Sequence, residues 1–453
     1  MTVMVFRDVT VASMDSDRLL MHQTVVVRGD RIESVGALAD VVVPPDAVVI
    51  DGSGRYLMPG LVDMHVHYDS RRYGLLFIAN GVTTVRNMRG TPFHLQMRAA
   101  AASADRPGPT IYTSGPLMDG NPPSWADAGP IIETAAEAEA SVSEQQRGGY
   151  DFLKIYTRLS LVAFDAVMAA AKRHGMRVVG HLPEAVPLAH AVNAGMESLE
   201  HPLSFLPALQ SDDSPFIGKP LAREMFDHVD IAKIPAMAAQ VQLAGAWTCP
   251  TLVVREKASL AGAFEEQMRR PEMQYLPPAV PAYWRGLSEE YQLTGGDAKL
   301  YRRTLGVQRS IVAGLHAVGA RILLGTDSNM PLVAWGFAIH DELRLLVEAG
   351  LSPYEAIRAG TSDAAEFLRA SNEFGRVASG LRADLILLEA DPFANVANVA
   401  RRAGVMLRGR WLAEPELLSM LRDSIATAAP SATMAVPHRT GFGEAVSSDG
   451  SGS

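Results

Sequence analysis

The stretch Met58-Pro59-Gly60-Leu61-Val62-Asp63-Met64-His65-Val66-His67 carries the strongest structural signal in the chain. Side chains two positions apart on a strand point to the same face, so His65 and His67 are expected to face the interior of a barrel together. A His-x-His pair alone is a weak signal, but it becomes strong when Pro-Gly-Leu-Val-Asp precedes it. Two imidazoles at the carboxyl end of a barrel strand are typical of a catalytic metal site.

Outward from this stretch, the middle of the chain alternates between strand and helix. Helical stretches such as Leu161–His174 and Leu188–Ala194 separate most of the strands and end at a glycine. Eight strands with helical crossovers over roughly 300 residues favour a parallel (β/α)8 TIM barrel over an open sheet. The expected strands are Leu61–Val66, Thr83–Arg86, Thr110–Thr113, Phe152–Tyr156, Arg177–Gly180, Glu197–Glu200, Trp247–Leu252 and Arg321–Gly325.

Both ends of the chain are rich in short strands. β-branched runs separated by Gly, Asp and Pro turns predict a small β-sandwich domain assembled from residues 1–57 and 375–423, with the barrel spanning 58–374. Residues 424–453 are small and polar without periodicity, which predicts a disordered tail. The terminal strands are expected at Val3–Phe6, Val9–Ala12, Thr24–Arg28, Arg31–Val35, Val48–Asp51, Ala383–Leu388 and Gly404–Leu407.

Composition limits the classes of function. The chain has 453 residues and a net charge of −9, which argues against nucleic acid or an anionic membrane as the main partner. Its one cysteine, Cys249, excludes a disulfide framework and a thiolate metal cluster, and it is expected in the core. The opening residues lack a secretory signal pattern and no run approaches 18 apolar residues, so a cytoplasmic protein without a membrane span is expected.

Four later residues, each at the end of an expected strand, complete a set of metal ligands. They are Lys154, His181, His201 and Asp327. Taken singly, either histidine fits a hydrogen-bonded core residue, Asp327 a helix N-cap and Lys154 an edge lysine. Their joint occurrence in barrel order favours a metal centre.

With these motifs in place, the chain resembles an imidazolonepropionase-like member of the amidohydrolase superfamily, over nearly its whole length. Besides the histidine pair, the resemblance rests on Gly325-Thr326-Asp327, His340-Asp341-Glu342-Leu343 and the closing segment 375–385. Asn87 departs from the pattern, because relatives often carry Asp after the arginine of the second strand. His340 and Glu342 themselves are expected to be mainly structural.

The resemblance implies a binuclear centre with a carboxylated lysine. CO2 converts the lysine of such relatives to an anionic carbamate, and burial favours the neutral amine that reacts. One ion would be held by His65, His67, the Lys154 carbamate and Asp327, and the second by the carbamate, His181 and His201. Zn2+ is the first choice, although Mn2+, Co2+ or Fe2+ also fit. A hydroxide bridging the ions would attack the substrate, with Asp327 as the proton acceptor.

The implied reaction is hydrolysis of an amide (C–N) bond, with a dipeptide or an N-acyl amino acid as the first choice of small-molecule substrate. Just past Lys154, Tyr156 is placed to donate to an oxyanion and Arg158 to hold a carboxylate. For both residues, a surface or packing role fits the sequence equally well. Families of this size often form homo-oligomers.

Three further questions stay open at the level of sequence. His181-Leu182-Pro183-Glu184 has the His-x-x-Glu spacing of a mononuclear deaminase or cyclic amidohydrolase, although that reading leaves Lys154 without a role. A non-catalytic amidohydrolase-like scaffold should lack ligands, whereas all six positions are filled here. Residues 262–296 interrupt the path from the seventh strand to its helix and fit either a lid over the barrel mouth or a surface or oligomer-contact insertion.

Overall fold

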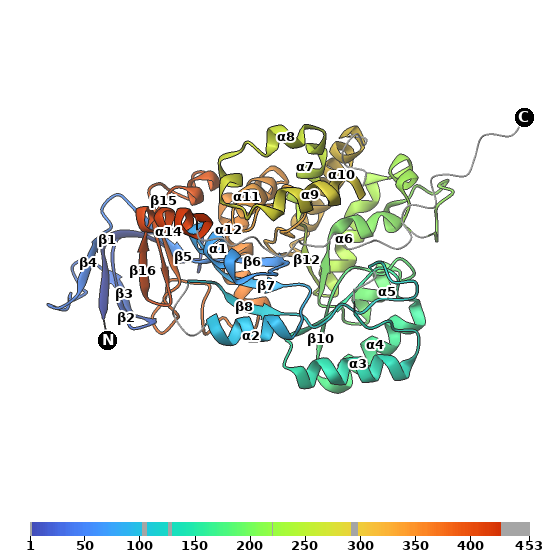
Figure 1. Cartoon of the computed structure of the whole chain (residues 1–453), viewed down its shortest axis with the longest axis horizontal. Coiled ribbons are helices and arrows are strands. Elements are labelled where there is room, and N and C mark those ends of the chain that lie inside the picture. The colour runs from blue at the N-terminus through green and yellow to red at the C-terminus, as the bar shows by residue number, and fades with distance from the viewer. Residues whose placement is uncertain (1, 102–106, 126–128, 220, 291–297, 427–453) are drawn as a thin grey trace, which may run out of the picture.

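Strands from both ends of the chain form one sheet. The structure is a computed structural model that describes residues 2–101, 107–125, 129–219, 221–290 and 298–426. The sheet has the order β16-β15-β14-β5-β1-β2-β3, and β4 pairs with β1. It lies at one end of the molecule (Figure 1). Its strands are β1 Val3–Ala12, β2 Leu19–Arg28, β3 Arg31–Ala37, β4 Val48–Asp51, β5 Tyr56–Pro59, β14 Leu385–Leu388, β15 Arg402–Leu407 and β16 Arg410–Ala413.

Local sequence explains how this sheet begins. The Gly29-Asp30 pair forms the hairpin between β2 and β3, and Gly29 adopts a φ of 61°, which glycine tolerates without strain. The two strands expected at 3–6 and 9–12 are a single strand, β1, whose register shifts between Phe6 and Val9 because Asp8 takes a φ of 58°. The strand β5 crosses the expected domain boundary after residue 57.

The eight expected parallel strands form two sheets, of three strands in the order β6-β7-β8 and five in the order β13-β12-β11-β10-β9. Backbone hydrogen bonds join the edges of these sheets: Gly115 donates to Phe152 at 3.0 Å and Met64 to Leu324 at 2.9 Å. The strands are β6 Leu61–Val66, β7 Val82–Asn87, β8 Thr110–Thr113, β9 Phe152–Ile155, β10 Arg177–Gly180, β11 Ser198–Glu200, β12 Trp247–Cys249 and β13 Arg321–Ile322.

Four of these strands are shorter than expected, β9 and β11 by one residue each and β12 and β13 by three each. The stretch predicted as a strand to Leu252 ends at Cys249, because Leu252 already starts helix α7 (Leu252–Ser259). The buried Glu342 carboxylate accepts from the backbone N–H groups of Leu252 and Val253 at 2.9 and 2.7 Å, which satisfies the first turn of that helix. The strand predicted to reach Gly325 ends at Ile322.

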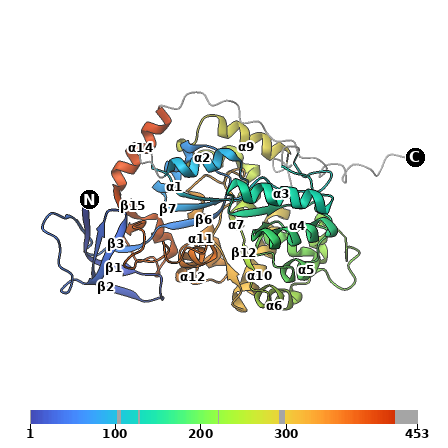
Figure 2. The same cartoon turned by 90° about the horizontal axis from the view of Figure 1, so that it is seen from below.

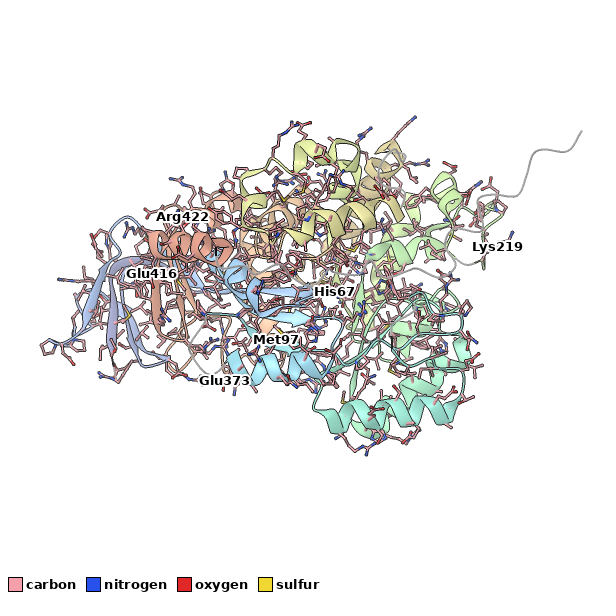
Figure 3. The ribbon with its side chains drawn as sticks, viewed as in Figure 1. His67, Met97, Lys219, Glu373, Glu416 and Arg422 are labelled. Carbon is pink, nitrogen blue, oxygen red and sulfur yellow. The ribbon has the colours of Figure 1, made fainter. Side chains whose placement is uncertain are left out.

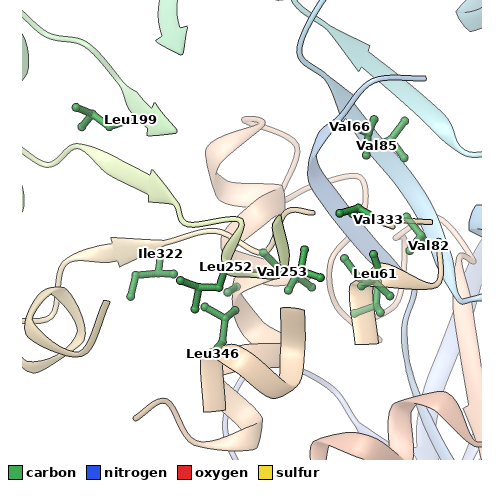
Figure 4. Packing of buried hydrophobic residues seen from close by; sticks show 14 of the residues in the cluster. Leu61, Val66, Val82, Val85, Leu199, Leu252, Val253, Ile322, Val333 and Leu346 are labelled. Carbon is green, nitrogen blue, oxygen red and sulfur yellow. The ribbon is translucent and has the colours of Figure 1, made fainter. Parts of the chain in front are cut away.

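Helices cover the parallel strands, and their apolar faces build the core. The helix predicted at Leu161–His174 is α4 as expected; Ser160 caps its start, and Gly175 ends it with a φ of 64°. Figure 4 shows Leu199 of β11, Ile322 of β13 and Leu346 among the buried side chains. The other main helices are α1 Gly74–Ala79, α2 Pro92–Ala101, α3 Ala135–Gly148, α5 Leu188–Asn193, α6 Ile234–Leu243, α10 Ala298–Ala317, α11 Ala338–Glu348, α12 Pro353–Ala359 and α13 Ser362–Phe367.

The insertion expected at 262–296 lies between α7 and α10 rather than before the first helix after the seventh strand. Its described part contains α8 (Phe264–Gln267) and α9 (Ala279–Glu290), and residues 291–296 lie outside the described residues. Trp284 of α9 is fully buried, stacks on Trp335 at 6.3 Å and donates through Nε1 to the backbone oxygen of Asn329 at 2.9 Å. The insertion is therefore anchored to the segment that follows β13.

The chain returns to the terminal sheet and continues into a helix that the sequence did not suggest. Strand β16 leads directly into α14 (Glu414–Ala426), which packs against α1 (Figure 2). The expectation of disorder from residue 424 is wrong for 424–426, which belong to this helix, and 427–453 lie outside the described residues. Within the part of the chain that is described, no helix is long and apolar enough to cross a membrane.

Candidate metal centre

The expected metal ligands lie at the carboxyl ends of the parallel strands. His65 lies next to the last residue of β6, His67 follows that strand, and Asp327 comes after β13. The Oδ1 atom of Asp327 is 3.1 Å from His67 Nε2 and 3.4 Å from His65 Nε2. The Oδ2 atom is 3.8 Å from Nε2 of His201, which follows β11. Figure 3 labels His67 close to the middle of the molecule.

Four imidazole rings form a continuous row in this site. The ring centroids of His67 and His65 are 5.7 Å apart, those of His65 and His201 4.7 Å, and those of His201 and His181 4.6 Å. His181 comes directly after β10, so the row joins the ends of β6, β10 and β11, and Asp327 reaches it from the segment after β13. The structure thus assembles all four histidines that the sequence selected.

Lys154 points into the protein from β9 rather than to an edge. Its side chain is fully buried, and burial lowers the pKa of its ammonium to about 8, although Glu200 and Asp327 act in the opposite direction. Gly180 gives it room, because a Cβ at that position would lie 3.0 Å from Lys154 Cδ and 2.3 Å from a backbone oxygen. The site therefore raises the fraction of neutral amine far above that of an exposed lysine at the same pH.

The protonation states of the site suit a cation. Burial lowers the pKa of His65 to about 4 and that of His201 to about 3, and it holds the pKa of His181 well below the usual value. For Asp327, burial alone would raise the pKa, but the histidines, chiefly His65 and His201, hold it well below its usual range. Neutral imidazoles and an ionised carboxylate are the forms that bind divalent metals.

Two buried ring nitrogens support the same conclusion. His65 Nε2 and His181 Nδ1 have no hydrogen-bond partner among the described residues. A buried polar atom without a partner costs free energy unless a ligand satisfies it. Ligand atoms of His65, His201 and Asp327 all lie within 4.8 Å of one another, so one ion can reach all three. The donor set fits a divalent cation.

Two of the candidate ligands are held in a strained backbone conformation. Asp327 has a φ of 56° and His201 a φ of 57°, in the left-handed region that residues with a Cβ rarely adopt. Such residues cluster at functional sites, where the surrounding structure enforces them. The backbone amide of Asp327 donates to the carbonyl of His65 at 2.7 Å, which ties the two ligands together.

Residues that the sequence did not single out surround these ligands. Glu200 Oε2 lies 2.8 Å from His65 Nδ1, Glu200 Oε1 accepts from the Arg86 guanidinium at 2.8 Å, and all three side chains are buried. Burial alone would raise the pKa of the Glu200 carboxyl, but Arg86 and His65 hold it well below its usual range. A signal existed in the sequence, since Arg86 and Glu200 are charged residues in short strands that hold no other charged residue.

Asp63 ties the first strand of the site to its last. Its carboxylate accepts from the backbone N–H of Thr326 at 2.9 Å and from the Thr326 hydroxyl at 2.7 Å. Burial raises the pKa of Asp63 to about 7.

Asn87, which departs from the pattern of the relatives, accepts from the Tyr68 backbone and donates to Thr113, both at 3.0 Å, so it organises the loop after β6.

The expected substrate-binding residues lie beside the row of histidines. The Tyr156 ring is 4.1 Å from that of His181, and Trp125 Nε1 donates to the Tyr156 hydroxyl at 3.0 Å. Arg158 lies 3.6 Å from Glu184, the acid of the His-x-x-Glu spacing. Tyr156 therefore reaches the site directly, whereas Arg158 and Glu184 form an ion pair on the neighbouring loops.

The other residues discussed from the sequence have structural surroundings. Cys249 is fully buried, and burial holds the pKa of its thiol well above the usual value, which fits a core residue. Glu342 caps α7, and His340 accepts from Arg402 at 3.3 Å. Both agree with the structural roles that we expected for them.

Comparison with known proteins agrees with this geometry. A family described as "Amidohydrolase family" matches residues 56–412, from β5 into β16. The imidazolonepropionase of Rubrobacter xylanophilus is 24% identical over 413 residues, which cover 83% of this chain and 86% of that protein. An adenine deaminase of the same organism is 36% identical over 102 residues, and that match spans only 17% of the deaminase and 19% of this chain.

Solved structures show the same fold. A bottromycin amidohydrolase has a TM-score of 0.74 at 24% identity, with 95% of this chain and 93% of that chain covered. A Xaa-Pro dipeptidase with methionine in its active site has a TM-score of 0.67 at 20% identity, covering 91% of this chain and 100% of the other. The strands that carry the histidine row are thus part of an architecture shared with these proteins.

Proposed function

This chain belongs to the amidohydrolase family and is a hydrolase of carbon–nitrogen bonds, and from that premise we propose that it uses a binuclear metal centre to cleave an amide bond in a dipeptide or an N-acyl amino acid. One observation carries the proposal: His65, His201 and Asp327 converge around a common point, next to a lysine that is fully buried. A buried lysine has no evident role at a site with a single ion.

The architecture in this proposal is a (β/α)8 barrel over residues 58–374, with a small β-sandwich domain from 1–57 and 375–423. Two backbone hydrogen bonds support the barrel, because they join the three-stranded sheet to the five-stranded sheet at both edges. They link Gly115 with Phe152 and Met64 with Leu324. In such barrels the active site lies at the carboxyl ends of the strands, which is where the candidate ligands stand.

The ligands divide into two sets in the proposed centre. His65, His67 and Asp327 would hold one ion, His181 and His201 the other, and a carbamate on Lys154 would serve both. The lowered pKa of Lys154, about 8, supports the carbamate because only the neutral amine reacts with CO2. Divalent ions, with Zn2+ as the first choice, would supply Lewis-acid polarisation and a water nucleophile at neutral pH.

The side chains of the chain itself would bind the substrate and move protons. The Asp327 carboxylate, kept ionised by its histidine neighbours, would take the proton of the attacking water and pass it to the leaving nitrogen. Tyr156, next to His181, would donate its hydroxyl to the developing oxyanion. Arg158 would exchange its partner Glu184 for the free carboxylate of the substrate.

A mononuclear deaminase or cyclic amidohydrolase is the second candidate. The local similarity to an adenine deaminase and the position of Glu184 beside Arg158 favour it. In that case Glu184 would shuttle the proton, and Lys154 would stay unmodified. A non-catalytic scaffold is the weakest candidate, because the donor atoms at the site are present and in protonation states that suit metal.

Metal content per chain and intact mass under native conditions test the proposal together. Close to two metals per chain, with added mass equal to one CO2 that is lost in the Lys154→Met variant, is the expected result. Hydrolysis of dipeptides or N-acyl amino acids by the same preparation would then identify the substrate class. One metal and no added mass would overturn the binuclear centre and move attention to Glu184→Gln and to deamination.

A further inference from the structure

A chain of three buried side chains leads from the interior of the protein to the metal centre. Arg86 of β7 donates through Nη2 to Oε1 of Glu200 at 2.8 Å. The Oε2 atom of Glu200 lies 2.8 Å from Nδ1 of His65. The side chains of Arg86 and Glu200 are fully buried and that of His65 is 1% exposed. Water therefore does not compete for these contacts.

The hydrogen-bonding capacity of each group fixes the direction of the chain. A guanidinium only donates, and Arg86 is held in place by two more acceptors, the Met64 backbone oxygen at 2.6 Å and the Ser198 hydroxyl at 3.2 Å. The Ser198 hydroxyl itself donates to Glu200 Oε1. An ionised carboxylate only accepts, so Glu200 can meet His65 only if the proton of that imidazole is on Nδ1.

We propose that Glu200, oriented by Arg86, is a positioning residue that fixes His65 in the tautomer with a bare Nε2, the nitrogen that faces the metal. The inference rests on the metal centre proposed above. Nε2 of His65 is buried without a hydrogen-bond partner in the described structure and lies 3.4 Å from Asp327 Oδ1. The orientation of the second ring nitrogen commonly determines how a histidine binds metal.

The neighbouring ligand shows why a carboxylate matters here. His201 has Nδ1 at 2.7 Å from the Thr251 hydroxyl, a group that can donate or accept and so leaves both tautomers possible. Of these two ring Nδ1 atoms, that of His65 meets a carboxylate, which cannot donate when it is ionised. A second set of close donor atoms, His65, Glu200 and Cys249, is unsuited to metal because both Glu200 oxygens are already engaged.

The variant Glu200→Gln tests this role almost without a change of shape. Arg86 and Ser198 would hold the amide oxygen, so the amide NH2 would face His65 and donate to Nδ1. That contact places the imidazole proton on Nε2 and blocks the metal-binding nitrogen. We expect metal affinity to fall about 10- to 100-fold, measured by competition with a chromophoric chelator for Zn2+.

Glu342→Gln is the matched control, because Glu342 is also a fully buried glutamate but accepts from backbone N–H groups and not from a ligand. It should keep the wild-type Zn2+ affinity. If Glu200→Gln keeps that affinity as well, the positioning role is wrong. If wild-type protein itself binds no Zn2+, the metal centre of the proposed function fails instead, so the two failures are distinguishable.

A direct measurement decides the matter even where Glu200→Gln does not fold. The ring nitrogens of histidine have different 15N chemical shifts in the two tautomers, and the His65→Gln variant identifies the signals of His65. Metal-free wild-type protein should show His65 protonated on Nδ1. A signal for protonation on Nε2 would overturn the proposal.

Discussion

Asp327 lies within 4 Å of three histidines and has a backbone conformation that residues with a Cβ rarely adopt. Asp327→Asn keeps the size of the side chain but removes its capacity to accept a proton. We expect kcat to fall by about 10²–10⁴-fold or more, with much of the metal retained, because four histidines and Lys154 remain. Activity would be followed on the substrate found by screening, and metal content by emission spectroscopy.

Asp165→Asn serves as the control for this substitution, since Asp165 pairs with His190 on the surface of α4 and should leave kcat unchanged. Near-normal turnover in Asp327→Asn would contradict the proton-transfer role. Complete loss of metal would show that Asp327 acts chiefly as a ligand.

Glu342 predicts a pH dependence of stability. Burial raises its pKa to about 8 from 4.5, with Asp63 and Glu256 adding to the rise. A raised folded-state pKa stabilises the fold below the unfolded-state value, and that stabilisation is lost as pH rises through the folded-state value. The free energy of unfolding of metal-free protein should therefore decline between about pH 4.5 and pH 8 through this group.

Glu342→Gln should remove this component, so the difference between wild type and variant should change with pH across that window. Urea unfolding at pH 5 and pH 8 measures the difference. The exposed Glu416→Gln should follow the wild-type profile at both pH values. A Glu342→Gln profile parallel to that of the wild type would contradict the prediction.

The sequence revealed the candidate ligands but not the residues that hold them in place. His65, His67, Lys154, His181, His201 and Asp327 were recognisable because each ends a strand, and strand ends meet at one edge. Glu200 and Arg86 are 114 positions apart, and their contact depends on how the strands are arranged around the site. Periodicity within a strand carries no information about such a pair.

At the scale of secondary structure, helix α9 stabilises the segment behind Asp327. Trp284→Phe retains most of the ring but removes the hydrogen bond to the Asn329 oxygen, which would then be buried without a donor. We expect a loss of about 1–3 kcal/mol in the free energy of unfolding. Trp284→Ala should cost more, about 3–5 kcal/mol, because it also leaves a cavity.

Urea unfolding of the two variants and wild type gives these values. Asn329 also donates to Asp69 at 3.0 Å, so the loss in Trp284→Phe should be accompanied by a change in kcat/KM. An equal free energy of unfolding for Trp284→Phe and wild type would show that the contact of α9 with the segment after β13 contributes little to stability. That result would revive the alternative of a lid that opens.

Most elements were predictable because their boundaries are local. Glycine and serine mark both ends of α4, and the strands β6, β8 and β10 occupy the expected residues. The shortening of β12 was not predictable. Helix α7 begins at Leu252 because the Glu342 carboxyl group accepts from its first backbone N–H groups, and Glu342 lies far along the chain. Helix α14 was missed, since its sequence runs without a break into a stretch of small residues.

At the scale of the whole molecule, the terminal sheet depends on the last part of the chain. All four residues of β5 pair with β14, and buried side chains of both ends share one apolar cluster. A chain that stops at residue 374 should therefore be insoluble, because it exposes the edge of β5 and the apolar face of the sheet. Centrifugation of cell lysates measures the soluble fraction.

Supplying residues 375–453 as a separate polypeptide in the same cells should restore part of the solubility, which would show that the missing strands are the cause. A soluble, well-folded chain ending at 374 would contradict the prediction. The composition of the sheet from both chain ends was itself predictable, because strand-rich segments flanked an alternating middle. The pairing of β5 with β14 was not, since register is decided in three dimensions.

The pairing of β5 with β14 also determines when the terminal sheet can be completed during synthesis in the cell. About 325 residues separate β5 from β14, and a ribosome adds about 5–20 residues per second, so β5 waits roughly 16 to 65 s for its partner. During that interval the strands of the first 59 residues are outside the ribosome while one edge of their sheet has nothing to bind. The nascent protein is therefore most exposed to aggregation before its final strands emerge, and chaperones that cover strand edges should matter most at that stage.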